Sequence, residues 1–559
     1  MADATAPRLD PLRRRLHVSE TKNTSSFERL SAEDRHRVLN ALGRGANRRD
    51  VLGLLGLAGA AGAFGSGLFA GLGGAFAAET PKKGGRIRAA GYSSSNADTL
   101  DPAKQSLSTD YVRCSMFYNG LTTLDERMAP QLALAESISH DKATVWTITL
   151  RKGVQFHDGK TLTADDVVYS LNRHKDPAVG SKAKALAAQM EEIKATGPLE
   201  VTIRLSGPNA DLPVILGTHH FFIVKDGTTD FSTAIGTGPF KCKEFQPGVR
   251  SISVRNENYW KGVGPWLDEV EFFGISDNGA RVNALLSGDV DFIGSIDPRS
   301  TRQVMDAKGF NVLETKSGNY TDLVMRMDGA PGNNPDFVLG MKYLFDREQM
   351  KKSIFRGFAE VANDHPLAPS NRYYSADVPQ RPYDPEKAKF HLKKAGALDS
   401  PLQIVASVAA ANSVEMAVVM QQAAQKIGLK IDIKQVPGDG YWSNYWMKAP
   451  VGFGNINPRP TADILFSLFF KSDAPWNESA WKNEKFDQLL AAARAEAEES
   501  KRKAMYHDMQ TMIHESSGIG IPVFINNLDA HVSRLKGLRP MPNGGMMGYG
   551  FAEHVWLDA

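Results

Sequence analysis

Two short stretches late in the chain concentrate side chains that could hold a small molecule. The first, residues 440–446, carries four aromatic side chains within seven positions: Tyr441, Trp442, Tyr445 and Trp446. Flat aromatic surfaces commonly form the walls of small-molecule pockets, where a few polar groups fix the orientation of the ligand. The same side chains could instead fill a hydrophobic core, so this stretch admits both interpretations.

The second stretch, residues 454–463, combines a cation and an anion near its end, Arg459 and Asp463. A guanidinium binds a carboxylate through two parallel hydrogen bonds, so Arg459 is a candidate for holding a ligand carboxylate. Asp463 could accept a hydrogen bond from a ligand amine. Alternatively, the two side chains pair only with each other or cap the helix that follows.

Sequence patterns typical of enzymes and metal sites are missing from the chain. There is no Gly-x-Ser-x-Gly elbow and no His-Glu-x-x-His pattern. Cys114 and Cys242 could form one disulfide or remain free thiols, and neither lies in a catalytic pattern. His219 and His220 are expected in a strand, where neighbouring side chains point to opposite faces and chelate poorly. We therefore expect no catalytic residue, no metal site and no cofactor.

Length and charge restrict the class of protein further. The chain has 559 residues, of which 42% are hydrophobic, and one core seldom supports that length, so at least two domains are expected. The formal charge is +3, yet residues 1–50 hold a surplus of four positive charges, which leaves a body close to neutral. A nucleic-acid-binding protein would need clustered basic residues, so no nucleic-acid partner is expected.

The N-terminus resembles an export signal. Arg48 and Arg49 precede an uncharged run of 24 residues, 51–74, in which nine are glycine, and Ala75-Phe76-Ala77 follows as an A-x-A cleavage pattern. Paired arginines before a mildly apolar stretch are typical of twin-arginine signals. The alternative is a retained membrane anchor, although such a span should be richer in large apolar residues. We expect cleavage near Ala78, twin-arginine translocase as a partner during export, and a periplasmic protein.

Strand-like and helix-like segments alternate through the rest of the chain. Residues 145–150 alternate as a half-buried strand, and a helix capped by Thr163 follows. Asp384 caps a helix that begins with Pro385 and ends at Gly396. Further strands are expected at 201–205, 290–292, 402–406 and 429–436, and further helices around 282–286 and at 413–427. A strand-helix-strand unit implies a parallel sheet, so the fold class is α/β.

Several segments resemble the extracellular solute-binding proteins of family 5, which include oligopeptide-, dipeptide- and nickel-binding proteins. The clearest runs from Trp146 to Leu171, and three more follow in the family's order: 236–240 with 255–260, 267–270 with 284–291, and 383–388 with 394–396. The motifs are mostly structural: residues 156–159 are a turn, and no Lys-Ser/Thr pair follows Gly236-Thr-Gly-Pro-Phe240 to make a phosphate loop. They identify the fold and not the ligand.

The resemblance implies a two-lobed periplasmic binding protein fold of class II, similar to cluster C, with an extra subdomain inserted in lobe I. The chain would cross between the lobes near Tyr320 and again near 519–524. The implied division is a leader and signal peptide over 1–77, lobe I over 78–122, 231–321 and 526–559, the inserted subdomain over 123–230, and lobe II over 322–525. Closure of the lobes over a solute works because the ligand contacts both of them.

The resemblance also ranks the candidate residues. Relatives place aromatic side chains in the loop after the corresponding strand, so Trp442 is the best candidate for a pocket wall, with Tyr441 beside it. Peptide-binding relatives have an aspartate that pairs with the peptide's amino terminus. Ile456, or its neighbour Asn455 or Asn457, stands at that position, so the carboxylate is missing, which argues against ordinary peptide binding.

The implied function is the solute-binding component of an ABC importer that captures a small polar, peptide-like or amino-acid-derived solute. Its partners would be that solute and the membrane permease subunits, and the protein itself is expected to be a monomer. A periplasmic hydrolase or a ligand-sensing receptor on the same fold is the alternative. The predicted ligand-binding residues are Tyr92, Tyr320, His365, Tyr441, Trp442, Asn455, Asn457, Arg459, Asp463 and Trp476.

Overall fold

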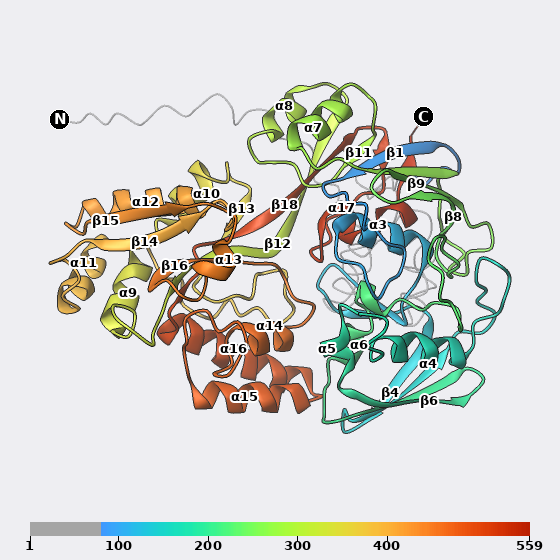
Figure 1. Cartoon of the computed structure of the whole chain (residues 1–559), viewed down its shortest axis with the longest axis horizontal. Helices are drawn as coiled ribbons and strands as arrows, with labels where there is room; N and C mark the ends of the chain where they lie inside the picture. Colours follow the sequence, from blue (N-terminus) through green and yellow to red (C-terminus); the bar gives the residue numbers. More distant parts are fainter. Residues whose placement is uncertain (1–79, 559) are drawn as a thin grey trace, which may run out of the picture. The chain divides into compact units, whose positions relative to one another are not determined.

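A long mixed sheet runs through the part of the chain that the computed structural model describes, residues 80–558 (Figure 1). Its strand order is β16-β12-β18-β11-β1-β10-β9-β8, with β13 added to β18 and β17 added to β12. The strands are β1 (Arg86–Gly91), β8 (Phe240–Gln246), β9 (Arg250–Arg255), β10 (Glu269–Gly274), β11 (Phe292–Ile293), β12 (Phe310–Met325), β13 (Ala359–Val361), β16 (Val451–Ile456), β17 (Ile519–Gly520) and β18 (Val523–Val532).

Strand β12 joins two halves of this sheet. Its first half pairs antiparallel with β18 from Phe310 to Thr315, and its second half pairs with β16 from Tyr320 to Met325. The register with β18 shifts between Thr315 and Asn319; Asn319 still pairs with Ile525 of β18, and pairing with β16 begins at Tyr320 on the other edge of β12. Side chains before the shift pack in one core and side chains after it pack in another, so a single strand serves two lobes.

Lobe I is the half built on β1, β8, β9, β10 and β11, with cores around Phe272 and around Ile293. β1 runs parallel to β10 and β11, whereas β9 and β8 continue antiparallel. Its further elements are α3 (Ser108–Phe117), α7 (Asn278–Leu286), α8 (Thr301–Asp306), β19 (Leu535–Lys536), α17 (Gly545–Gly548), η3 (Phe551–Glu553) and β20 (Trp556–Leu557).

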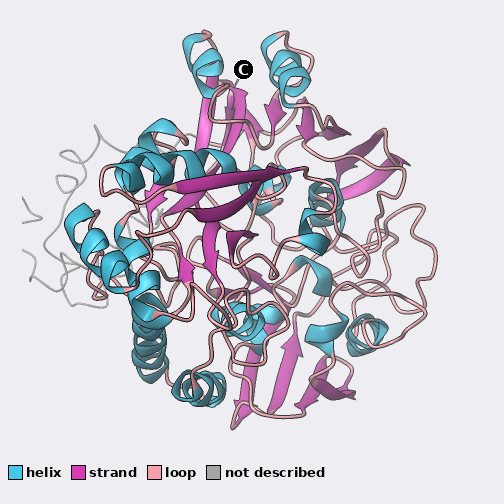
Figure 2. Cartoon of the chain, turned by 60° about the vertical axis from the view of Figure 1, so that its left-hand side comes forward, coloured by secondary structure: helices cyan, strands magenta, loops and turns pink. Residues whose placement is uncertain are grey.

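The inserted subdomain is the segment with its own four-stranded antiparallel sheet, β4-β5-β7-β6, which lies apart from the long sheet (Figures 1 and 2). Its core gathers around Ile148 and Ile203. Its elements are β2 (Thr122–Leu124), β3 (Pro130–Leu132), β4 (Ala135–Asp141), β5 (Val145–Leu150), α4 (Ala164–Arg173), α5 (Lys184–Ala187), β6 (Met190–Gly197), β7 (Glu200–Leu205), α6 (Leu212–Ile215) and η2 (His219–Phe221).

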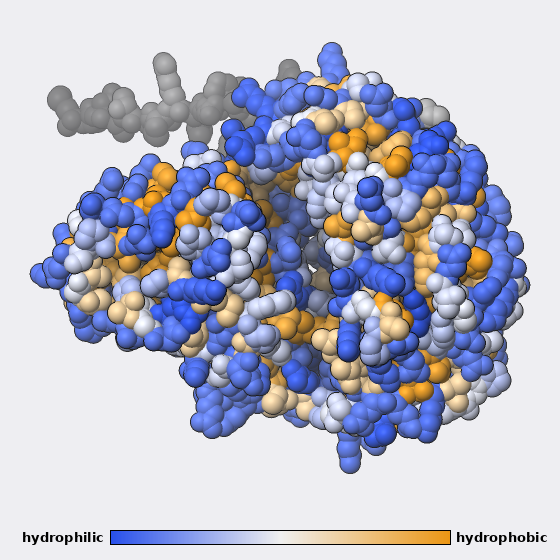
Figure 3. Space-filling view, in the orientation of Figure 1, coloured by the Kyte–Doolittle hydropathy of each residue, from blue (hydrophilic) through white to orange (hydrophobic). Residues whose placement is uncertain are grey.

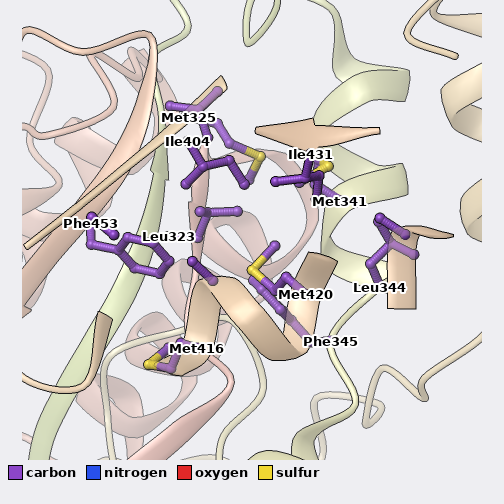
Figure 4. Packing of buried hydrophobic residues seen from close by; sticks show 14 of the residues in the cluster. Leu323, Met325, Met341, Leu344, Phe345, Ile404, Met416, Met420, Ile431 and Phe453 are labelled. Atoms are coloured by element: carbon purple, nitrogen blue, oxygen red, sulfur yellow. The ribbon is translucent and has the colours of Figure 1, made fainter. Parts of the chain in front are cut away.

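Lobe II is the half that holds the second part of β12 together with β16 and a parallel pair, β14 (Leu402–Ser407) and β15 (Ile431–Val436). Helix α12 (Ser413–Gln425) connects the pair. Its other helices are α9 (Pro335–Tyr343), α10 (Arg347–Ser353), α11 (Pro385–Lys394), α13 (Tyr441–Asn444), α14 (Ala462–Phe469), α15 (Glu484–Ala495) and α16 (Glu499–Ser516). Figure 4 shows one of its two cores, in which Leu323 and Phe453 of the long sheet meet Met416 and Met420 of α12.

Most of the expected elements are confirmed, but the strand expected at 290–292 is only β11, Phe292–Ile293. The half-buried strand is β5, Val145–Leu150. Thr163 begins α4, and the Asp166 carboxylate accepts hydrogen bonds from the backbone and hydroxyl of Thr163. Asp384 caps α11 by accepting from the Lys387 amide, and β14 pairs parallel with β15 as the strand-helix-strand pattern predicted.

Two of the family-like segments contact each other. The His157 amide donates to the Gly236 carbonyl at 2.8 Å, and the His157 ring contacts the Gly238 carbonyl at 3.1 Å. The turn at 156–159 therefore fastens the subdomain to lobe I. The expectation of a strand at His219 and His220 was wrong: these residues form the short helix η2, which is closed by backbone hydrogen bonds from Phe221 to Thr218 and from Phe222 to His219.

The expected signal peptide, with Arg48 and Arg49, lies outside the described residues. Within residues 80–558, no helix has both the length and the apolar character needed to cross a membrane.

Replacing Leu323 by alanine should destabilise lobe II. The side chain is fully buried at the centre of the second half of β12, so truncation removes apolar burial and leaves a cavity. We expect a loss of about 3 kcal/mol in the free energy of unfolding, measured by urea titration followed by circular dichroism. Val263→Ala, at a side chain that is 68% exposed, is the control and should change little. Equal losses in both variants would contradict the placement of this core.

Candidate functional site

In lobe I, three parallel strands end at the same edge of the sheet. β1, β10 and β11 finish at Gly91, Gly274 and Ile293, and Tyr92 follows β1 with 39% of its side chain exposed. Arg281 of α7 organises this edge, because its guanidinium donates to the backbone carbonyls that follow the strands. The acceptors are the carbonyls of Ile275, Ser276, Gly294 and Ser295. Ligands of open α/β sheets bind outside the carboxyl ends of the strands.

Asp529 of β18 fixes the opposite side of the same edge. Its carboxylate accepts from the Ser295 amide at 2.9 Å and from the Met546 amide at 2.6 Å. Burial raises the pKa of Asp529 to about 6. Met546, Met547 and Tyr549 all have left-handed backbones, with φ of 52°, 59° and 68°, which costs about 1 kcal/mol or more for each residue. The carboxylate therefore holds a strained turn that places the Tyr549 ring, whose hydroxyl is hydrogen-bonded to Tyr92.

In lobe II, the parallel strands β14 and β15 end at Ser407 and Val436, and α13 follows directly after β15. Tyr441 and Trp442 begin this short helix and point in different directions. Tyr441 is buried and its hydroxyl donates to the Phe453 carbonyl at 2.7 Å, so it packs in the core. Trp442 is 41% exposed. Figure 3 shows the surface hollowed between lobe I and lobe II, and α13 lies beside this hollow in Figure 1.

An aromatic row extends from Trp442 across the lobe II surface. We use this name for Trp442, Trp446, Trp476 and Phe469, whose neighbouring ring centroids lie 5.6, 6.5 and 5.4 Å apart in that order. Trp476 is 40% exposed, whereas Phe469 is buried at the inner end of the row. Segments 442–446 and 469–476 thus combine into one continuous wall of rings.

Arg459 lies at the inner end of the aromatic row. Its guanidinium carbon is 5.3 Å from the centroid of the Phe469 ring, and Nη1 donates to the Asn457 and Pro458 carbonyls at 2.9 and 3.4 Å. Among residues 80–558, no carboxylate lies within ion-pair distance of this guanidinium. Burial lowers the pKa of Arg459 because removing the cation from water disfavours its charged form. A half-buried cation without an acidic partner favours a ligand that brings a negative charge.

Two buried carboxyl groups lie behind the row. The Glu478 carboxylate accepts from the indole nitrogen of Trp446, and the Asp322 carboxyl group shares a hydrogen bond with Glu478 and has no other partner within the described part of the chain. A Cβ at Gly454 would come within van der Waals overlap of both carboxyl groups, so they occupy the space where a side chain of β16 would stand. Burial raises the pKa of Asp322 well above its ordinary value and that of Glu478 to about 7. The neutral form of at least one acid is therefore favoured at neutral pH.

The remaining predicted residues are dispersed around the crossing between the lobes. The Asn455 amide donates to the Tyr320 carbonyl and to the Thr321 hydroxyl, which ties β16 to β12. Asn457 is exposed beside Arg459, while Tyr320 is buried in the second core of lobe II. His365 is buried with both ring nitrogens unpartnered among residues 80–558, and burial lowers its pKa to about 4.

The structure gives Asp463 a partner that none of the three roles considered for it named. Its carboxylate does not pair with Arg459; both oxygens accept from Nε of Arg494 at 3.0 Å. Thr461, and not Asp463, caps α14 by accepting from the Ile464 amide. Since the Asp463 side chain is buried and already paired, it does not present an acceptor for a ligand amine.

Cysteine and histidine chemistry finds no support in the described residues. Cys114 is buried and Cys242 partly buried, and both are free thiols, which settles the alternative left open by the sequence. Burial raises the pKa of both thiols, which disfavours the reactive thiolate. Between residues 80 and 558, no group of three or more potential ligands could hold a metal ion.

Within residues 80–558 the arrangement therefore offers an aromatic wall, a guanidinium without an acidic partner and two strand edges, which are features that can hold a small molecule. The sequence pointed to Trp442, Trp476 and Arg459, and the structure brings these three together. It did not point to Phe469 and Trp446 as parts of the same row, nor to Arg281 and Asp529 as the organisers of lobe I. A buried arginine and a buried aspartate in apolar segments are the only signals that could have indicated the latter pair.

Comparisons with known proteins give consistent matches. The family model described as bacterial extracellular solute-binding proteins, family 5 Middle, matches residues 128–478. The glutathione-binding protein GsiB of Salmonella paratyphi A is 26% identical over 473 residues, which cover 81% of this chain and 91% of that protein.

Solved structures give the same fold. The ABC transporter substrate-binding protein CtaP of Listeria monocytogenes superposes with a TM-score of 0.75 at 22% identity, over 85% of this chain and 100% of CtaP. The periplasmic binding protein DppA of Helicobacter pylori, solved with the peptide STSA, superposes with a TM-score of 0.69 at 23% identity, over 86% of this chain and 99% of DppA.

The buried carboxyl pair should make stability depend on pH. Glu478 has an ordinary pKa of 4.5 and a folded-state pKa of about 7, so between these values the folded protein holds a proton that the unfolded chain releases. Stability should thus fall as the pH rises from about 5 to 7, by roughly 1–3 kcal/mol. Thermal unfolding across this range should show a smaller fall for Asp322→Asn, because a neutral amide removes the repulsion between the two acids.

Asp399→Asn, at an exposed position, is the matched control and should keep the wild-type slope. Asp463 and Asp529, with pKa values raised to about 6, add to the fall with the same sign in every variant. Parallel curves for wild type and Asp322→Asn would show that the pair does not carry a shared proton.

Proposed function

The chain belongs to the bacterial extracellular solute-binding proteins of family 5, the solute-binding components of ABC importers, and we propose that its solute is a small peptide-like or amino-acid-derived molecule with a carboxylate. Proteins of this family work in the periplasm or outside the cell. The proposal rests mainly on Arg459. Its guanidinium is half-buried, has no acidic partner in the described chain and lies at the end of the aromatic row. A carboxylate would complete its hydrogen bonds, and the row would cover the apolar part of the solute.

Electrostatics in the rest of the site support this choice of ligand. Asp463 is paired with Arg494, and the acids behind the row are buried, so none of the three offers an exposed carboxylate to a ligand amine. Where peptide-binding relatives have an aspartate, this chain has Ile456, which is buried at the end of β16, or its neighbour Asn455 or Asn457. Recognition of an acid should therefore contribute more to affinity than recognition of an amino terminus.

The proposal also covers the boundaries of the two lobes and the role of the N-terminal leader. We propose the division into lobe I at 78–122, 231–321 and 526–559, a subdomain at 123–230 and lobe II at 322–525; separate cores in these parts support it. The change of partners in β12 beside Tyr320 supports the first crossing. We propose that residues 1–77 are a twin-arginine signal, that the mature protein is monomeric, and that it delivers the solute to permease subunits.

Arg459→Met should abolish the preference for a free carboxylate. Isothermal titration with the tetrapeptide STSA and with its C-terminal amide should show wild type binding the acid about 30-fold or more tightly than the amide, since a charge-assisted pair in a desolvated site is worth about 2–5 kcal/mol. In Arg459→Met the two peptides should bind alike. Glutathione, which carries two carboxylates and is the ligand named for GsiB, serves as a second probe.

Arg302→Met is the matched control, because the Arg302 side chain is 89% exposed on α8 and, among residues 80–558, pairs only with Asp306. It should keep the wild-type ratio of affinities. If wild type binds acid and amide equally, or if Arg459→Met retains the preference, the role assigned to Arg459 is wrong.

We further propose binding without turnover. Neither thiol lies in the aromatic row or at the strand ends that form the site, so the variant Cys114→Ser/Cys242→Ser should bind each probe within about twofold of wild type. Overnight incubation of wild type with glutathione or STSA, followed by mass spectrometry, should return the intact probe. Cleavage that persists in freshly purified protein and disappears in the double variant would instead indicate a hydrolase.

A further inference from the structure

The subdomain touches lobe II at a point far along the chain from β12 and β18. Asp211 precedes α6 of the subdomain, and only 1% of its side chain is exposed. Its Oδ1 accepts from Nη2 of Arg372 at 2.8 Å and lies 2.9 Å from Nη1 of Arg502. Both arginines belong to lobe II, one before Tyr373 and one on α16. A single carboxylate of the subdomain thus neutralises two cations of lobe II.

The lobe II side of this contact is organised to receive a carboxylate. Tyr373 and Tyr506 stack with centroids 4.6 Å apart, and the guanidinium carbons of Arg372 and Arg502 lie 4.6 and 5.0 Å from the Tyr373 ring. Nε of Arg502 donates to the Ala493 carbonyl at 3.0 Å. These contacts fix two neighbouring positive charges whose mutual repulsion is relieved only when an anion lies between them.

Further contacts surround the ion pairs. The Ala210 amide donates to the Arg494 carbonyl at 2.9 Å, and Ile464 of α14 packs against the core of the subdomain. Figure 1 shows α14, α15 and α16 beside α5 and α6 at this place. A hydrogen bond, an apolar contact and two ion pairs therefore join elements that the backbone connects only through the distant strands β12 and β18.

Some of the buried polar atoms in this contact lack hydrogen-bond partners. Oδ2 of Asp211, Nη2 of Arg502 and the Tyr506 hydroxyl are buried without partners among the described residues. Each would regain hydrogen bonds to water if the surfaces separated, which lowers the net cost of separation. Such a contact can form and break, whereas a fully satisfied buried network would hold the two surfaces together permanently.

We propose that Asp211, Arg372 and Arg502 form a latch that holds the subdomain against lobe II in the solute-free protein and stays engaged when the lobes close over the solute. The latch rests on the proposed function, since closure over a solute is what it would stabilise. Its three residues are positioning residues: they lie outside the aromatic row and act through the distance between the lobes. Ligand contacts with both lobes and latch contacts would then favour the same closed state.

The first test needs no solute. Asp211→Asn keeps the shape of the side chain and removes its charge. Hydrogen–deuterium exchange of the ligand-free mature protein should rise severalfold in segments 209–216 and 499–506, and the core of β14 and α12 should keep its wild-type protection. Small-angle scattering should show a larger radius of gyration. Glu136→Gln, at an exposed position on the subdomain strand β4, is the control and should match wild type.

The second test measures solute release. With STSA and glutathione as probes, Asp211→Asn should raise the dissociation rate about tenfold and change the association rate by less than about threefold. Arg372→Met should have a smaller effect, because Arg502 still pairs with Asp211, and the double variant should be no worse than Asp211→Asn alone, because that substitution already removes both ion pairs. Additive losses would point to two independent structural roles.

The outcomes separate the latch from the function on which it rests. Unchanged exchange in both segments and unchanged scattering in Asp211→Asn would overturn the latch, and so would raised exchange with an unchanged dissociation rate. If neither probe binds to wild type, the proposed ligand class fails, and the exchange and scattering of the ligand-free protein still decide whether the contact holds the lobes together. Exchange that rises throughout lobe II would mean that Asp211 supports folding only, which also overturns the latch.

Discussion

Strand β12 pairs with β18 up to Asn319, through a register shift after Thr315, and with β16 from Tyr320 onward, and the geometry of the site follows from this change of partner. Alternate side chains of a strand face opposite sides of the sheet, so a register shift reassigns each position to a new core. Val312 packs in lobe I and Leu323 in lobe II as a result. The lobes share a hydrogen-bonded strand instead of a loose linker, and movement between them has to be absorbed by the few residues at the shift.

The strand ends on either side of this crossing carry the polar groups of the site. In lobe I, Arg281 satisfies the carbonyls beyond the parallel strands and Asp529 satisfies amides at the same edge. Both side chains are buried and fully used by the backbone, so they form the frame of the site. Arg459 in lobe II differs, because it is bonded only to two nearby carbonyls and faces a ring. Arg459, which we propose to bind the solute, thus differs from the two structural residues in that its charge is not already used by other groups of the described chain.

Several other buried charged side chains in the chain are paired with groups of opposite charge. Arg113 pairs with Asp98, and Asp364 accepts from both Arg347 and Arg381, since an unpaired charge in the interior costs several kcal/mol. At two places buried charged groups lack part of this pairing. One is the contact between Asp211 and Arg502, where the subdomain meets lobe II, and the other is the carboxyl pair behind the aromatic row. Conformational equilibria and proton binding are expected to concentrate at such places, because there a small change of geometry alters the solvation of an ion.

Local features of the fold could be read from the sequence because their causes are local. The alternation of apolar and polar residues predicted the strand Val145–Leu150. The N-cap Asp384, followed by Pro385, predicted the start of the helix Pro385–Lys394. The density of aromatic residues after β15 also indicated a wall, and Arg459 stood out as a cation in a loop of lobe II. Tertiary structure decided which of these side chains are available. Tyr441 turned inward and Trp442 outward, although they are neighbours in sequence.

The pairing of charged residues that are distant in sequence was also set by the tertiary structure alone. Asp463 was four residues from Arg459 in sequence, yet its partner is Arg494 on the following helix, and this choice leaves Arg459 available to a ligand. Asp211 and Arg502 are almost 300 residues apart and meet through one carboxylate oxygen. The spacing of hydrophobic residues and helix capping depend on residues close together in sequence, so both can be recognised in the sequence. The electrostatic energy of a charged side chain depends instead on the groups that folding brings within a few ångströms of it.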